Sequence, residues 1–193
     1  MKRILQNIIL GLVLGAAFGL GSITVTETAN HYAEPGKYSA TIVQQAQAGA
    51  LTDFAENKTV DALIRAQAIG TPVTWYAALY TACPTDSTAG TEVTGGSYAR
   101  VAITAGLTQW AGTQSAGSTT ASSGTGGTTS NNAAITYPAP TANWSVVNCW
   151  GLTDASTAGN IWIYSALTTP KTINNGDAAP SFAIGAATFQ IDN

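Results

Sequence analysis

Apolar and polar side chains follow two different patterns within residues 74–104, which read TWYAALYTACPTDSTAGTEVTGGSYARVAIT. In the first run, large aromatic and aliphatic side chains fall on both faces of an extended chain, which predicts a strand in the middle of a sandwich. In the second run, Ala99, Val101 and Ile103 alternate with Tyr98, Arg100 and Thr104. One face is therefore expected in the core and the other in solvent. The segment predicts a sheet, and it holds no constellation typical of a reaction centre.

The rest of the C-terminal half is also expected to form short strands. Turn-forming segments rich in Pro, Asn, Asp and Gly separate the apolar runs. Residues 112–132 consist almost entirely of Gly, Ser, Thr, Ala and Asn, which predicts a long loop or arm. Short strands at this spacing predict an all-β fold, a β-sandwich of antiparallel strands. The expected strands are 134–137, 144–152, 160–167 and 182–191.

One helix is expected ahead of the strands, over residues 51–69. Thr52 and Asp53 suit its first turn, and Asp61 and Arg65 have the i,i+4 spacing of an ion pair. A glycine and a proline after residue 69 give a stop signal. We expect this leading helix to cap the sheet, with the following side chains buried: Leu51, Phe54, Ala55, Leu63, Ala66 and Ile69.

The N-terminal segment is apolar and carries a glycine stripe. Two basic residues precede the uncharged residues 8–20, the order of a secretory signal, although no clear cleavage site follows. Gly11, Gly15 and Gly19 recur every four residues, so on a helix they form one stripe that another backbone can approach closely. We interpret the segment as an oligomerising or anchoring element buried against other subunits. A removed signal peptide and a membrane segment are the alternatives.

Charge is sparse along the whole chain. Only 9% of residues are charged and 45% are hydrophobic, with a formal net charge of -3. Few and scattered basic residues argue against nucleic-acid binding, which depends on clustered Lys and Arg. A weakly charged surface is common where subunits pack against one another, because few charges then need desolvation.

The residue types that carry chemistry are equally sparse. Cys83 and Cys149 are too few for a disulfide framework, so two buried reduced thiols are the preferred interpretation and a single bridge is the alternative. His31 is the only histidine, which leaves no ligand set for zinc and no base for a serine triad beside the sheet. Most candidate carboxylates lie in or beside turns, where Asp is favoured for structural reasons. We expect no enzymatic function, no cofactor and no metal.

Three residues are candidates for surface contacts. Trp110 flanks the long loop and is the best candidate for an exposed aromatic that could stack on a sugar, whereas most other tryptophans fall within strand runs. Arg100, beside Tyr98, is a candidate interface anchor, because both residue types are enriched at binding hot spots. A solvated arginine on the outer strand face is the simpler interpretation.

Several motifs together resemble a known family. The order of ENK, ALYTACPTD, GTEVTGGSYAR, AITYP and LTTPKTINNGD is similar to small tailed-bacteriophage virion proteins of the tail fibre or head decoration type. The resemblance covers about residues 51–192. It implies a compact β-sandwich with a leading helix, a repeated subunit on the virion surface or an appendage, and no catalytic residues. Family members begin close to the ENK helix, so the segment before it is additional in this chain.

We therefore expect two parts: residues 1–50, an apolar anchoring and assembly extension with a connector, and residues 51–193, a helix-capped β-sandwich domain. The expected function is that of a non-enzymatic virion structural protein that assembles as a homo-oligomer through the extension. Its expected partners are copies of itself and other virion proteins, with host surface glycans and a membrane left open. The alternative is a secreted or membrane-tethered bacterial adhesin or carbohydrate-binding module.

Overall fold

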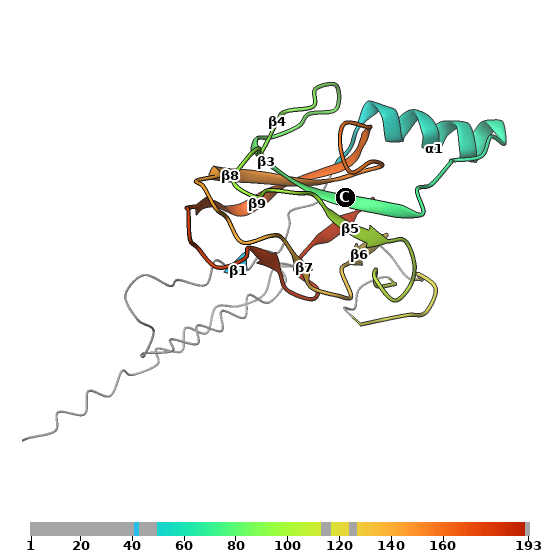
Figure 1. The fold of residues 1–193 in the computed structure, drawn as a ribbon. Coiled ribbons are helices and arrows are strands. Elements are labelled where there is room, and N and C mark those ends of the chain that lie inside the picture. Colours follow the sequence, from blue (N-terminus) through green and yellow to red (C-terminus); the bar gives the residue numbers. More distant parts are fainter. Residues whose placement is uncertain (1–40, 43–49, 113–116, 124–126, 192–193) are drawn as a thin grey trace, which may run out of the picture. The chain divides into compact units, whose positions relative to one another are not determined.

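The computed structural model describes residues 41–42, 50–112, 117–123 and 127–191, which all lie in one of the two units of the chain, residues 33–193. Strands dominate this part, with a single helix (Figure 1). The elements in chain order are β1 (Thr41–Ile42), β2 (Ala50–Leu51), α1 (Asp53–Arg65), β3 (Thr74–Ala82), β4 (Thr91–Glu92), β5 (Val101–Thr104), β6 (Thr128–Ser130), β7 (Ile135–Thr136), β8 (Ser145–Thr153), β9 (Ile161–Ile173), β10 (Ser181–Phe182) and β11 (Thr188–Gln190). The expected all-β fold with a leading helix is confirmed.

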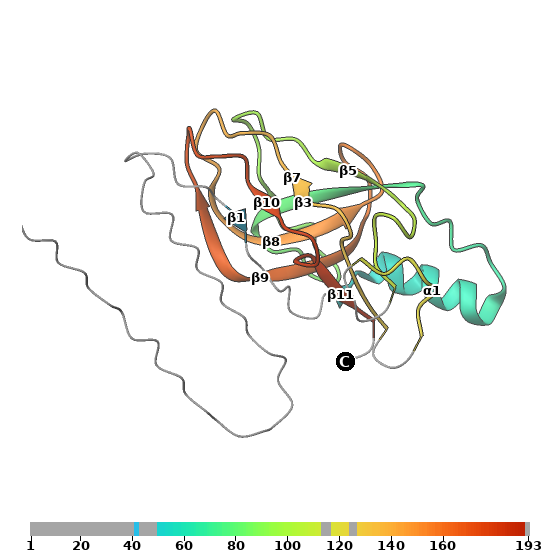
Figure 2. The ribbon, with the colours of Figure 1, turned by 90° about the horizontal axis from the view of Figure 1, so that it is seen from below.

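The largest sheet has six strands in the order β2-β9-β8-β3-β4, with β5 also paired to β3. All of its pairings are antiparallel. A second sheet has the order β1-β10-β7, in which β1 runs parallel to β10, and β11 pairs with β6. The large sheet and the strands around β7 and β10 form two layers (Figures 1 and 2).

The main core lies between these two layers. The register places Leu79 opposite Trp150 and Ala77 opposite Leu152, so these side chains share one face of the large sheet. All four are buried and belong to one cluster with Phe182 of β10. Both runs of the segment 74–104 thus form strands of the large sheet, as predicted. The second strand begins only at Val101, and the expected solvated position is wrong for Tyr98, which packs against the main core ahead of the strand.

The opposite face of the large sheet carries a smaller cluster, formed by Ala78, Tyr80 and Cys149. Gly151 is required here, because a Cβ at this position would lie 2.8 Å from a backbone oxygen and 3.2 Å from the Tyr80 ring. Cys83 and Cys149 form a disulfide, with their Cα atoms 5.2 Å apart. The preferred interpretation of two reduced thiols is therefore wrong in this structure: the chain turns back after β3 and brings the exposed Cys83 onto Cys149.

The helix is shorter and less covered than expected. Thr52 caps its N-terminus through a hydrogen bond from Ala55 N, and Ala66 ends it in the left-handed conformation with φ 53°. Ala55 is the one buried residue of α1. The expected buried stripe is wrong at Leu63, Ala66 and Ile69, which are all exposed, because the helix packs on the sheet only through its first turns.

The strand boundaries also differ from the expectation. The predicted strand 182–191 is two short strands, β10 and β11, separated by a turn. β9 runs on to Ile173 because a bulge accommodates Pro170: Val147 pairs with Lys171, and Cys149 pairs with Ala166. Part of the predicted loop 112–132 forms β6. No helix among the described residues is long and apolar enough to cross a membrane.

Candidate functional site

The backbone hydrogen bonds along one edge of β3 are interrupted at Leu79. β5 pairs with residues 74–77 of β3 and β4 pairs with residues 80–82, so neither strand faces Leu79 directly. The Tyr98 hydroxyl fills this gap by accepting a hydrogen bond from the Leu79 amide at 2.8 Å, and the Leu79 carbonyl accepts one from Val93 N at 2.9 Å. A side chain thus completes the backbone pairing that an edge amide needs.

Glu92 connects this tyrosine to Arg100. The Tyr98 hydroxyl donates to Glu92 Oε1 at 2.9 Å. Arg100 binds both carboxylate oxygens, with Nε 2.8 Å from Oε1 and Nη2 2.7 Å from Oε2. Only 8% of the Arg100 side chain and 25% of the Glu92 side chain are exposed, so this is a largely desolvated bidentate ion pair.

The Nη1 atom of Arg100 reaches the turn between β8 and β9. It lies 2.9 Å from Thr153 Oγ1, 2.7 Å from the Ala155 carbonyl oxygen and 2.8 Å from the Ala158 carbonyl oxygen. Arg100 therefore ties together β4, the start of β5 and the β8–β9 turn. The five N–H groups of a guanidinium allow one side chain to make all of these contacts.

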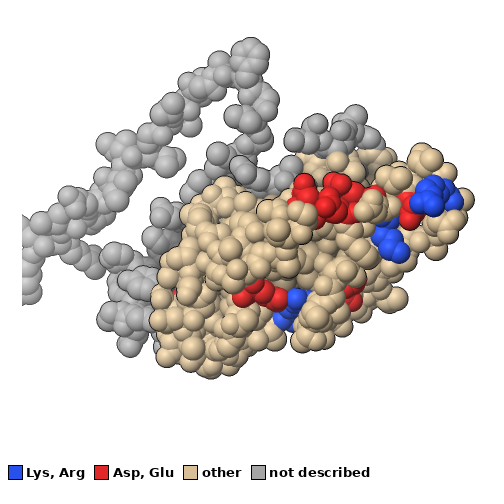
Figure 3. All heavy atoms as spheres, turned by 90° about the horizontal axis from the view of Figure 1, so that it is seen from above, with Lys and Arg blue, Asp and Glu red and all other residues tan. Residues whose placement is uncertain are grey.

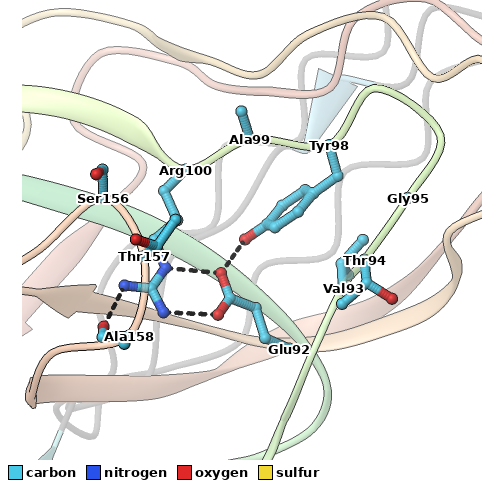
Figure 4. Close-up of a pocket in the computed structure, with 10 residues that line it drawn as sticks. All are labelled: Glu92, Val93, Thr94, Gly95, Tyr98, Ala99, Arg100, Ser156, Thr157 and Ala158. Carbon is cyan, nitrogen blue, oxygen red and sulfur yellow. Dashed lines mark hydrogen bonds and ion pairs between the residues drawn. The ribbon is translucent and has the colours of Figure 1, made fainter.

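A hollow of about 520 Å³ lies beside this network. Figure 4 shows that the guanidinium of Arg100 and the hydroxyl of Tyr98 both point toward the carboxylate of Glu92 and bind it. The hollow is lined by Glu92, Val93, Thr94, Gly95, Tyr98, Ala99, Arg100, Ser156, Thr157 and Ala158. The two charged side chains that line the hollow, Glu92 and Arg100, bind each other.

The ionisation of the network favours a structural role. Burial, together with the nearby Glu92 charge, raises the pKa of Tyr98 well above its ordinary value. The hydrogen bond to Glu92 raises the pKa of Arg100 despite partial burial. Neither group changes its protonation state near neutral pH, so neither is tuned for acid–base chemistry. The arrangement can hold β4, the start of β5 and the β8–β9 turn rigidly together.

Three other described carboxylates accept hydrogen bonds that hold turns or join distant segments. Asp154 accepts hydrogen bonds from Asn160 N at 2.7 Å, Asn160 Nδ2 at 2.9 Å and Trp162 Nε1 at 3.2 Å. Burial raises the pKa of Asp154, but these hydrogen bonds outweigh it and leave the pKa below its usual value. Asp177 accepts from Asn174 N at 2.8 Å, and Asp86 accepts from the Tyr164 hydroxyl at 2.6 Å. Among the described residues, no group of three or more His, Cys, Asp and Glu side chains is placed to hold a metal ion.

The structure brings two of the three predicted contact residues together. Tyr98 and Arg100 share the Glu92 carboxylate, so Arg100 is not the solvated side chain that the sequence favours. Trp110 lies elsewhere: it is half-buried, packs against the main core and forms an isolated bridge with Asn131. Binding of a partner by any of the three stays a prediction.

Gly11, Gly15 and Gly19 lie outside the described residues. Glu92, in contrast, belongs to the network although the expectations from the sequence give it no role there. A signal for it exists, because Glu92 and Arg100 are the only charged residues between Asp86 and Asp154. Two opposite charges alone in an uncharged stretch are expected to pair.

Most of the surface in Figure 3 is uncharged, with acidic and basic side chains gathered in a few places. Comparison with known proteins gives one family match. The family model described as podophage GP4 fiber I protein gp80 matches residues 50–190. No curated protein matches the chain.

Proposed function

This chain belongs to the podophage GP4 fiber I protein gp80 family, and from that premise we propose that it is a non-enzymatic fibre subunit of a phage virion that assembles as a homo-oligomer through residues 1–50. The observation that carries this proposal is the family match itself. It covers residues 50–190, so almost the whole described domain is shared with the fibre family.

The sequence of residues 1–50 supports the proposal that copies of the chain associate through this segment. The family match begins at residue 50, where β2 also begins, so the preceding segment is not part of the shared domain. That segment contains Gly11, Gly15 and Gly19 at a spacing that permits close helix packing. An uncharged stretch of this kind is suited to burial against other subunits.

The Arg100 network supports a structural role for the domain. Its charged and hydroxyl groups bind one another, and they fix β4, β5 and the β8–β9 turn. An appendage subunit needs such rigidity, whereas an active site needs polar groups directed at a substrate.

Deletion of residues 1–21 tests the assembly mode. We expect the full chain to sediment as a homo-oligomer, and the deletion variant to sediment as a monomer with the same circular dichroism spectrum. In particles, the full chain should be present in many copies and the deletion variant should be lost.

The mass of the chain in purified particles provides the matched control. An intact mass supports an assembly element, whereas loss of the first twenty or so residues would assign the segment to a signal peptide. Unchanged association and incorporation after the deletion would contradict the proposal.

A further inference from the structure

The disulfide has one exposed end and one buried end. Cys149, in the middle of β8, is fully buried in the cluster with Ala78 and Tyr80. Cys83 directly follows β3 and is exposed. Thiol–disulfide exchange requires a thiolate to attack one of the two sulfur atoms, so its rate depends on access to that atom. A thiol from solvent therefore reaches this bond from the Cys83 side.

Cys83 begins a compact loop, residues 83–90, between β3 and β4. Gly90 ends the loop directly against Cys83, because a Cβ at Gly90 would lie 2.7 Å from the Cys83 carbonyl carbon. Within the loop, Thr85 N donates to the Thr88 carbonyl oxygen at 3.0 Å, and the two threonine hydroxyls lie 2.7 Å apart. Both ends of the loop thus meet at Cys83, and opening of the disulfide frees the base of the loop as one unit.

Asp86, in the middle of this loop, contacts two other elements. Its backbone carbonyl oxygen accepts a hydrogen bond at 3.0 Å from the amide of Asp53, the first residue of α1. Its carboxylate accepts one from the Tyr164 hydroxyl of β9 at 2.6 Å. The first N–H groups of a helix have no partner within the helix, so one of them depends here on the loop. Figure 1 shows the loop between β3 and β4 beside the start of α1.

We propose that the Cys83–Cys149 disulfide is a redox-sensitive clamp. When closed, it holds loop 83–90 against the first turn of α1, and its reduction by a dithiol releases the loop and the start of the helix. β2 and α1 are the elements with which the family domain begins, at residue 50. The redox state therefore sets how firmly the domain holds the point at which the N-terminal segment enters it. This inference goes beyond the proposed function and does not depend on the homo-oligomer.

The exchange needs an external dithiol and proceeds in two steps. A thiolate of the dithiol attacks Sγ of Cys83, the S–S bond breaks, and Cys149 leaves as a thiolate that takes a proton from water. The second thiolate of the dithiol then attacks its own sulfur in the mixed disulfide and displaces the Cys83 thiolate, which is protonated in turn. The protein disulfide gains two electrons and becomes two thiols, and the dithiol is oxidised to a cyclic disulfide.

The large sheet does not depend on the bond in the same way. β3 and β8 pair at five positions, from Tyr76 opposite Thr153 to Tyr80 opposite Cys149. The main core also covers the other face of these two strands. Parts of a protein with few buried contacts open at a lower free energy than its core. Reduction is therefore expected to act on the loop and the start of α1 while the sheet stays folded.

The rate at which dithiothreitol reduces the folded full chain is the first test. Mass spectrometry after alkylation counts the free thiols with time. The rate should be the same in Ile173→Val, which weakens the buried core opposite Ser145 and leaves loop 83–90 unchanged. If the bond were accessible only in the globally unfolded chain, this variant would be reduced about fivefold faster. That result, or a bond that dithiothreitol does not reduce without denaturant, would overturn the clamp.

Hydrogen exchange followed by mass spectrometry is the second test. In the reduced full chain, peptides covering residues 50–58 and 83–92 should exchange at least about fivefold faster than in the oxidised chain, because they lose the hydrogen bonds that the loop makes. Peptides from β5 should not change. The matched control is the double variant Cys83→Ala with Cys149→Ala, in which dithiothreitol should change nothing.

The outcomes of this second test decide between the clamp and other roles of the bond. Faster exchange in the loop alone would show that the loop does not hold the helix, and no change at all after full reduction would show that the bond holds neither. Faster exchange in every peptide would make the bond a stabiliser of the whole domain. Any of these results overturns the inference, and so does an equal response of the double variant. None of them bears on the fibre role, which the deletion of residues 1–21 tests separately.

Discussion

At the scale of single residues, the ion pair of Arg100 and Glu92 is much more buried than the ion pair of Arg65 and Asp61. Arg100→Ala should lower the free energy of unfolding by about 3 kcal/mol, because it leaves the largely buried Glu92 carboxylate without its partner. Urea denaturation at neutral pH measures the loss. Arg65→Ala is the matched control: its ion pair with Asp61 has side chains 69% and 38% exposed and should cost less than about 0.5 kcal/mol. Equal losses in the two variants would show that burial does not decide the strength of the pair.

The sequence predicts this network only in part. Alternation places Arg100 on the outer face of its strand, which is the correct face. The pairing of Arg100 with Glu92 could have been predicted, because these two are the only charged residues between Asp86 and Asp154. The contacts with Ala155 and Ala158 could not be predicted, because a turn supplies carbonyl groups whose position depends on the packing of the whole sheet.

At the scale of elements, the disulfide fixes the segment that follows β3. Replacing both Cys83 and Cys149 by Ala should lower the free energy of unfolding by about 2–5 kcal/mol, because the unfolded chain loses a constraint across a sequence separation of 66 residues. A reductant should lower the wild-type Tm and leave the Tm of the double variant unchanged. A wild-type Tm that does not respond to reductant in the unfolding scan would speak against a stabilising bridge.

Hydrophobic periodicity predicts the long strands well and the helix less well. β5 follows from alternation, whereas β3 and β8 follow from apolar runs that are buried on both faces. The apolar pattern of α1 is real, but a pattern does not say whether its partner lies in the same chain or in another molecule. This is why Leu63 was expected inside the domain and is exposed in the structure.

At the scale of the whole molecule, the tyrosines predict sensitivity to alkali. Burial, with the nearby Glu92 charge, raises the pKa of Tyr80, and burial also raises the pKa of Tyr98 and Tyr137. The hydrogen bond to Asp86 raises the pKa of Tyr164 to about 12. In each case the unfolded chain releases its proton first, near pH 10, so the stabilisation is complete below about pH 10 and is lost as the pH rises through the raised values.

Thermal unfolding between about pH 8 and about pH 11 checks this expectation, and the Tm should fall steeply above about pH 10. Tyr137→Phe is a suitable control, because the Tyr137 hydroxyl has no hydrogen-bond partner among the described residues. The variant should keep its Tm near pH 8 and show a shallower fall in alkali. A Tm that stays constant up to about pH 11 in the wild type would contradict the prediction.

The outer strands of the large sheet limit the addition of strands from other molecules. On the β3 side, the outer strands β4 and β5 have two and four residues, and the Tyr98 hydroxyl occupies the β3 amide that lies between them. A strand from another molecule therefore finds little open backbone to pair with along β3. In the homo-oligomer that we propose, side chains rather than backbone pairing would form any contact at this edge. A particle can then carry many copies at high local density while each sheet ends at its own border, without spreading into an amyloid-like ladder.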